Sequence, residues 1–258
     1  MDFKRISTVF ILFLLSSMLF AQETKQTKYP FNQLRLSVTP SLCSSLKINH
    51  EGGVTIFKSN PTLGAEATIS YYQHIVNGLG VSLGVGINST AYSYSFSFAP
   101  HVTYPIQVEE KIYQPTGMIT VPLALNMMIP IKSSSWNVDI QAGARLNYLF
   151  NSGSESVFTD DIGMADFRNI KELPRYWVEV KRDTEIAFSY FLKAGVTYTT
   201  KRNNAFFCNI MGNYSPKEAL TGNYILRTSR GVSYGSFKQT LNYLGLEVGY
   251  ALTLCKKR

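Results

Sequence analysis

The stretch Leu79–Ile87, "LGVSLGVGI", decides the fold. Every odd position holds a large aliphatic residue, and every even position holds Gly or Ser. Side chains on a β-strand alternate between two faces, so this pattern predicts a strand with one apolar and one weakly polar face. A soluble sandwich or lipocalin would turn the apolar face inward, whereas a membrane barrel would turn it toward lipid. Features elsewhere in the chain decide between these orientations.

Similar alternation recurs along the chain, without any long pattern of helical period. It predicts eight strands: Leu34–Ser41, Leu63–His74, Leu79–Phe98, Thr116–Pro130, Trp136–Phe150, Ile186–Thr199, Ala205–Tyr214 and Gln239–Leu254. In the third of them the apolar residues change from odd to even positions between Ile87 and Tyr92. This change predicts a β-bulge near Asn88–Ala91.

The connections between the predicted strands alternate in length. Those after the second, fourth and sixth strands are tight, and Asn77-Gly78 in the first of these is a strong hairpin signal. The other four are long: Leu42–Thr62, Ala99–Pro115, Asn151–Glu185 and Ser215–Lys238. Short periplasmic turns and long extracellular loops are typical of an outer-membrane barrel.

Two patterns inside the long loops, Val54–Phe57 and Tyr176–Val180, are further candidate strands. Each is shorter than the roughly 9–11 residues that a tilted spanning strand needs. The expected fold is therefore an all-β, eight-stranded antiparallel transmembrane up-and-down β-barrel, with ten strands as the alternative.

The residue types on the two faces indicate which face meets lipid. The weakly polar face carries small residues such as Gly80, Ser82, Gly143 and Gly195, which suit the narrow interior of an eight-stranded barrel. The other face is aliphatic and aromatic without charge, and only 16% of the chain is charged, which is low for a water-facing surface.

Aromatic residues near both strand ends predict two interfacial belts. At the short-turn end they are Trp136, Tyr71 and Tyr198, and at the long-loop end they are Tyr148, Phe150, Phe188, Tyr190, Tyr94 and Phe96. We therefore expect the apolar face to look outward.

Six charged residues fall on the presumed lumen face. They are Arg35, Glu66, Asp139, Arg145, Lys193 and Glu247. Three are positive and three negative, and isolated charges are costly in a closed interior, so we expect them to form ion pairs with a structural role. A proton- or ion-conducting path is the alternative.

The N-terminus has the features of a signal peptide. Lys4 and Arg5 precede the apolar run Val9–Leu15 and a small residue, Ala21, at a cleavage point. The run is too short for a spanning helix, so a membrane anchor is the weaker interpretation. The expected organisation is a signal peptide (1–21), a periplasmic segment (22–33), an outer-membrane barrel (34–256) and a basic tail (257–258).

Several segments resemble the PorT-like outer-membrane β-barrel proteins of Bacteroidota-type bacteria. They are "FAQ" at the signal end, Thr120–Pro130 ("TVPLALNMMIP"), Val138–Phe150 ("VDIQAGARLNYLF") and the closing "LNYLGLEVGYALTL". Val121, Pro122 and Leu123 carry the first strand motif, and Ala142 and Gly143 carry the second. The resemblance implies an outer-membrane location and a barrel, while one member type is linked to protein secretion.

The expected function is a non-enzymatic integral outer-membrane protein with a structural or surface-interaction role. One alternative is an outer-membrane hydrolase, either lipid-modifying or a protease, in which His101 of one long loop would meet Asp160 and Asp161 of another. A component of a secretion or transport apparatus and a soluble exported lipocalin-like carrier are the others. Of the other histidines, His74 falls at the short-turn end on the presumed lumen face, and His50 lies in a different long loop from His101.

No catalytic residue, cofactor or metal site is expected. Asp160, Asp161 and Asp166 lack the spacing of a Ca²⁺ loop, and the three cysteines (Cys43, Cys208 and Cys255) give no disulfide framework, so we interpret them as small packing residues. Expected partners are outer-membrane lipid and lipopolysaccharide, the barrel-assembly machinery, and a protein or glycan at the long loops, where Trp177 stands among charges. Nucleic acid is not expected, because the net charge of +8 is spread along the chain.

Overall fold

The computed structural model describes residues 31–51, 56–76, 78–98, 108–131, 135–150, 154–159, 175–181, 185–228 and 231–256. Within these residues the regular structure consists of β-strands. No helix in them is long and apolar enough to cross a membrane. The expected signal peptide, most of the segment 22–33 and the basic tail lie outside the described residues.

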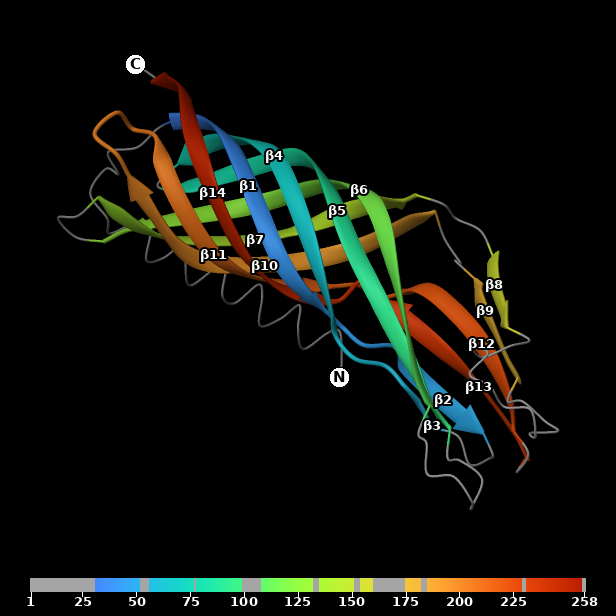
Figure 1. The fold of residues 1–258 in the computed structure, drawn as a ribbon. Helices are drawn as coiled ribbons and strands as arrows, with labels where there is room; N and C mark the ends of the chain where they lie inside the picture. The colour runs from blue at the N-terminus through green and yellow to red at the C-terminus, as the bar shows by residue number, and fades with distance from the viewer. Residues whose placement is uncertain are drawn as a thin grey trace, which may run out of the picture.

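Eight antiparallel strands close into a barrel (Figure 1). They are β1 (Phe31–Cys43), β4 (Thr62–Val76), β5 (Leu79–Phe98), β6 (Val108–Pro130), β7 (Trp136–Leu149), β10 (Ile186–Thr199), β11 (Ala205–Tyr214) and β14 (Tyr243–Lys256). Around the ring the order is β5-β4-β1-β14-β11-β10-β7-β6, and the ring closes because β5 also pairs with β6. The predicted eight-stranded barrel is confirmed, and the ten-stranded alternative is wrong.

A second sheet stands beyond one end of the barrel. It has the order β2-β13-β12-β9-β8 and is built from segments that the sequence patterns place in long loops. Its strands are β2 (Lys47–Glu51), β13 (Gly231–Thr240), β12 (Glu218–Thr228), β9 (Arg175–Lys181) and β8 (Ser154–Thr159). A further short strand, β3 (Ile56–Lys58), pairs with the far part of β5.

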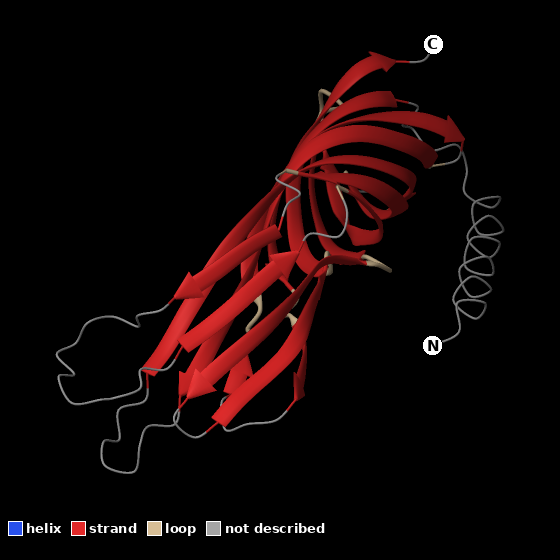
Figure 2. Cartoon of the chain, turned by 90° about the vertical axis from the view of Figure 1, so that its right-hand side faces the viewer, coloured by secondary structure: helices blue, strands red, loops and turns tan. Residues whose placement is uncertain are grey.

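Strands β5 and β6 are long enough to belong to both parts of the molecule. Their pairing runs without interruption of register from the short-turn end, Leu79 opposite Met127, to Phe98 opposite Val108. We call the second sheet, β3, and residues 90–98 of β5 with 108–116 of β6 the extension. Figure 2 shows its strands continuing away from the barrel.

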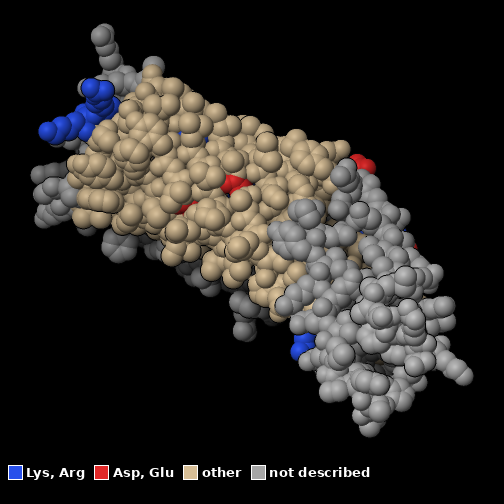
Figure 3. Space-filling model, in the orientation of Figure 1, with Lys and Arg blue, Asp and Glu red and all other residues tan. Residues whose placement is uncertain are grey.

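The outer wall of the barrel is apolar. Its exposed side chains include Leu36, Val38, Ile69, Leu83, Val85, Ile87, Val121, Leu123, Leu125, Leu146, Leu192, Val196, Ile210, Leu246 and Val248. The opposite face of the same strands is buried and carries small and polar residues, as β7 shows with Asn137, Asp139 and Gln141. Figure 3 shows this wall nearly all tan. The predicted outward orientation of the aliphatic rows is therefore confirmed.

Aromatic residues occupy both ends of the outer wall. Trp136 packs against Tyr198 at the short-turn end, with ring centroids 5.1 Å apart. At the other end Tyr148 meets Phe150 edge-on, and Phe188 meets Tyr190 in the same way. All six, together with Tyr71, are exposed as expected.

Tyr94 is not part of the outer belt, contrary to expectation. It is 1% exposed and lies on the inner face of β5, like Tyr92. The predicted bulge near Asn88–Ala91 is also wrong, because the pairing of β5 with β6 keeps one register through those residues. What changes along β5 is which face is apolar: Leu83, Val85 and Ile87 face outward, and Tyr92 and Tyr94 face inward.

The last predicted strand also needs correction at its start. Strand β14 begins at Tyr243, and residues 231–240 form the separate strand β13. The two strands are separated at Asn242. Its backbone carbonyl accepts a hydrogen bond from the Ser44 amide, and its side-chain oxygen accepts one from the Ser215 amide. At the other end, β1 begins at Phe31, ahead of the expected start at Leu34.

Candidate functional site

The interior of the barrel is the most chemically distinctive part of the molecule. All six charged residues predicted to face the lumen are buried there, and they come from five strands: β1, β4, β7, β10 and β14. They form three ion pairs: Arg35–Asp139, Glu66–Arg145 and Lys193–Glu247. Every positive charge among these six therefore has a negative partner, as the even balance of the sequence suggests.

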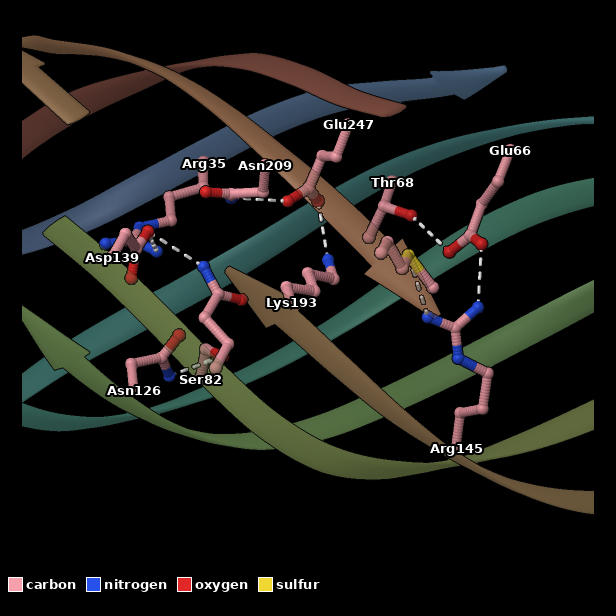
Figure 4. A network of polar contacts seen from close by, with 12 residues as sticks. Arg35, Glu66, Thr68, Ser82, Asn126, Asp139, Arg145, Lys193, Asn209 and Glu247 are labelled. Atoms are coloured by element: carbon pink, nitrogen blue, oxygen red, sulfur yellow. Dashed lines mark hydrogen bonds and ion pairs between the residues drawn. The ribbon is translucent and has the colours of Figure 1, made fainter. Parts of the chain in front are cut away.

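The register places the three pairs at three levels along the barrel axis. On β7, Asp139 lies nearest the short turn, Gln141 is opposite Lys193 of β10, and Arg145 lies nearest the long-loop end. Figure 4 shows the pairs following one another in this order through the interior. The charges thus form a column rather than a single cluster.

The level nearest the extension is the best connected. Arg145 Nη1 donates to Glu66 Oε2 at 2.7 Å and lies 2.5 Å from Tyr243 Oη, which donates to the same carboxylate oxygen at 2.6 Å. Thr68 donates to the other oxygen of Glu66 at 2.9 Å. The guanidinium stacks on the ring of Phe191, with its carbon 4.7 Å from the centroid. This pair bridges the lumen, because β4 and β7 are not neighbours.

The middle level joins Lys193 and Glu247. Their Nζ and Oε1 atoms are 2.5 Å apart, and Asn209 of the intervening strand β11 donates to Glu247 Oε2 at 2.9 Å. Lys193 also lies over the ring of Phe191, with Nζ 5.3 Å from the centroid. Phe191 thus contacts cations of two levels and links them.

The level nearest the short turns joins Arg35 and Asp139. Their strands, β1 and β7, lie on opposite sides of the ring, so the 3.4 Å contact crosses the whole lumen. Gln141 donates to the same oxygen of Asp139 at 3.0 Å, and Arg35 stacks over Tyr72, with 4.4 Å from its guanidinium carbon to the ring centroid.

Large side chains fill the lumen between these levels. Arg145, Tyr72 and Met211 are among the most deeply buried residues of the described chain, and Cys43, Ala124, Phe191, Met211 and Tyr243 pack as one cluster. Buried charges are costly unless they are paired and hydrogen-bonded, and each level contains an ion pair with further hydrogen bonds, although Asp139 Oδ1 and Arg145 Nε have no partner among the described atoms. Chemically, the arrangement can hold the wall strands together and block the bore.

Tyr243 and Phe191 are lumen residues that sequence reasoning missed. Both follow the parity of neighbouring lumen charges, Tyr243 with Glu247 on β14 and Phe191 with Lys193 on β10. The alternation therefore contained the signal. It was obscured because Tyr and Phe on a membrane barrel are expected on the lipid face.

The interior of the extension has the opposite character. Its core is formed by Leu46, Phe57, Tyr92, Tyr94, Val178, Val180, Leu220, Tyr224 and Phe237. Phe57 and Tyr224 stack with 4.3 Å between ring centroids, and Phe57 also stacks with Tyr94. An apolar core of this kind is typical of antiparallel sheets with one face toward water. The exposed face of the extension carries polar residues such as Lys47 and Asn49, together with Ile225, Val232 and Tyr234.

Two of the three histidines, His50 and His74, lie within the described residues. His50 of β2 contacts the hydroxyl of Tyr224 through Nδ1 at 2.6 Å, with the rings stacked. His101, Asp160, Asp161 and Asp166 lie outside the described residues. Among the residues that are described, no three His, Cys, Asp or Glu side chains come together to hold a metal ion.

The cysteines occupy different environments. Cys43 is buried in the lumen cluster with Met211, whereas Cys208 is exposed on the outer wall. The expectation that Cys208 is a packing residue is therefore wrong, and its environment is that of the neighbouring aliphatic residues of the wall.

The chain is similar in structure to several solved outer-membrane proteins. The protein OprG from Pseudomonas aeruginosa matches with a TM-score of 0.44 and 8% identity, over 87% of this chain and 97% of that one. A major outer membrane protein from Thermus thermophilus matches with a TM-score of 0.43 and 11% identity, over 86% and 99%. The outer membrane protease OmpT from Escherichia coli matches with a TM-score of 0.36 and 8% identity, over 90% and 99%.

No family model matches the chain, and no curated protein matches it in sequence. The description of this molecule as a closed eight-stranded barrel with a folded extension rests on its own strand pairing.

Proposed function

We propose that this protein is an integral outer-membrane β-barrel with a filled lumen, which anchors the folded extension at the cell surface. Its role is non-enzymatic, structural or in surface interaction, and the lumen charges stabilise the anchor. The observation that carries the proposal is the reversal of polarity between the two parts of one continuous structure. The barrel is polar inside and apolar outside, and the extension is apolar inside.

The reversal is explained if the two parts lie in different solvents. Hydrocarbon accepts the exposed aliphatic wall and disfavours charge by roughly 2–4 kcal/mol at mid-depth. Water disfavours the same wall, because a soluble protein rarely exposes a continuous apolar patch larger than a few hundred square ångströms. The aromatic pairs at both ends of the wall mark the expected interfaces.

Cell fractionation and conductance test the proposal together. The protein should remain with the outer membrane through a carbonate wash, and the purified barrel in planar bilayers should give no large, steady ohmic channels. Recovery in the soluble periplasm would refute the membrane location. Large steady channels would refute the filled lumen and leave the location intact.

A further inference from the structure

One ladder of the extension sheet carries three lysines at the same height. Lys47 of β2 pairs with Lys238 of β13, Lys238 with Thr221 of β12, and Thr221 with Lys181 of β9. We call these four residues the rim row. The three lysines are exposed, and they come from segments far apart in sequence. With strands about 4.8 Å apart, the row spans roughly 14 Å.

The rim row lies near the barrel end of this sheet, with the pairs Leu220–Gln239 and Glu218–Thr240 of β12 and β13 closer still. Strand β2 follows β1 after a short link, β13 precedes β14, and β9 precedes β10. The last exposed aliphatic residues of those barrel strands are Leu42, Leu244 and Ile186. At about 3.3 Å per residue the lysines stand at most about 20 Å along the strand beyond the apolar wall, and less along the barrel axis because strands tilt.

The row itself is positively charged, and the negative charge of this face lies at Glu218 beside the row and at Glu179 and Glu51 in the two rows beyond it. Lys47 and Lys238 are directly opposite each other, and like charges in that arrangement destabilise a sheet. The described carboxylate in contact is Glu218, 3.4 Å from Lys238, and both side chains are about half exposed. A backbone hydrogen bond and then a hydrogen bond from Lys238 lower the pKa of Glu218. Lys217 beside it is also exposed, so one carboxylate faces several ammonium groups.

The two ladders farther from the barrel offer different chemistry on the same face. The next row contains Asn49, Ser236, Asn223 and Glu179, and the row after it contains Glu51, Tyr234 and Ile225. Tyr234 is 50% exposed. Rows lie about 7 Å apart, the scale of one sugar ring. Hydroxyls, amides and carboxylates such as Glu179 and Glu51, followed by an exposed aromatic ring, are groups that bind saccharide hydroxyls and sugar faces.

We propose that this face of the extension binds the phosphorylated saccharide headgroup of an outer-leaflet glycolipid of the lipopolysaccharide class. The rim row contacts the phosphates, and the two rows beyond it contact the sugars. The order of the rows supports this occupant, because phosphates nearest the membrane meet the lysines and sugars farther out meet the polar and aromatic rows. The proposal rests on the proposed outer-membrane location.

Binding of fluorescent lipopolysaccharide to the full chain, folded in detergent, tests the proposal. The variant K47Q/K238Q removes the two opposed lysines. Its matched control, K201Q/R202Q, removes two charges from the short turn between β10 and β11, at the opposite end of the barrel. Lysines near an anionic surface contribute about fivefold each, so K47Q/K238Q should bind about thirty-fold more weakly and the control should bind normally.

Two further probes identify the source of the anion. Dephosphorylated lipopolysaccharide should bind the wild-type protein as weakly as the intact form binds K47Q/K238Q, and inorganic phosphate should compete only at far higher concentration. Unchanged binding by K47Q/K238Q, equal loss in the control, or competition by phosphate at the concentration of the glycolipid would overturn the proposal.

The variants must be folded, which heat-modifiable mobility in a gel shows. If K47Q/K238Q does not fold, K47R/K238R should bind normally and the single variants should each lose about fivefold; failure of that pattern also overturns the proposal. Because binding is measured in detergent, its outcome is independent of cell fractionation. Failure here therefore leaves the membrane location standing, and the reverse holds as well.

Discussion

Each buried charge of the lumen depends on one oppositely charged partner. Arg145 is 1% exposed and Glu66 is 3% exposed, and each binds the other and Tyr243. The residue types and the strand parity predict that these groups face the lumen in equal numbers. The particular partners could not be predicted, because strand order and shear decide which residues of non-neighbouring strands share a level.

Arg145→Met should destabilise the barrel strongly. It leaves the Glu66 carboxylate buried without its cation, which typically costs about 3–5 kcal/mol of unfolding free energy. Urea unfolding of the refolded protein measures the change. Lys238→Met, which breaks the exposed Lys238–Glu218 pair, is the control and should leave the unfolding free energy nearly unchanged, because water screens that pair. Equal losses in the two variants would refute the structural role of the lumen pair.

Tyr224 gives the extension a pH dependence of its own. Burial raises the pKa of its hydroxyl above the ordinary value of 10.0. A raised pKa in the folded state means that the stabilisation is present below about pH 10 and is lost as the pH rises through the folded-state pKa. Protease digestion of the extension should accelerate in that range.

Tyr224→Phe removes the titrating group and should reduce this alkaline acceleration relative to the wild type. At a mildly alkaline pH, below the range in which Tyr224 titrates, the variant should be digested somewhat faster, since it lacks the contact with His50. An identical alkaline rise in both proteins would show that another group controls it.

At the scale of the strand, the predictable part of the fold is the barrel, whose strands have one face toward lipid and the other toward the polar interior. Barrel strands such as β7 alternate without interruption because one face is apolar throughout. Strand β12 is harder to predict because a glycine interrupts the apolar residues of its buried face, which carries Leu220, Gly222 and Tyr224. Gly222 in the sequence does not indicate a core position, because what makes it one is its packing against Phe237 of the neighbouring strand β13.

Gly222 is required by that packing. A Cβ at this position would meet the ring of Phe237 and the backbone carbonyl of Glu179. Gly222→Val should therefore open the extension to protease while leaving the heat-modifiable mobility of the barrel intact. Gly212→Ala on β11 is the control, because a Cβ there meets nothing within 4 Å. Loss of barrel mobility in Gly222→Val would show that the two parts fold as one unit.

Because β5 runs from the lipid-facing wall into the extension, a lysine should destabilise the protein at wall positions of this strand and be tolerated at positions in the extension. Ile87 is 66% exposed on the wall, so Ile87→Lys should cost roughly 2–4 kcal/mol and reduce outer-membrane recovery. Ser93, beyond the change of polarity, should accept Ser93→Lys with little effect. Quantitative blotting of outer-membrane fractions measures both, and equal recovery of the two variants would contradict the assigned boundary.

The whole molecule consists of a membrane anchor, filled by its own side chains, and a folded extension that carries the rim row near the barrel. The anchor follows from alternation and charge balance in the sequence. The extension depends on contacts among segments as distant as Phe57 and Tyr224, which periodicity cannot reveal. The surface that we assign to glycolipid exists only in that assembled sheet.

A spin-label scan along β5 tests the central claim most directly. Single cysteines placed from Val81 to Ser93, in a chain without its native cysteines, report collisions with oxygen in lipid and with a water-soluble nickel complex. In liposomes, Leu83, Val85 and Ile87 should collide with oxygen and not with nickel, and Ser93 should show the reverse. Nickel access at all four positions would contradict the account, because it would place the aliphatic wall in water.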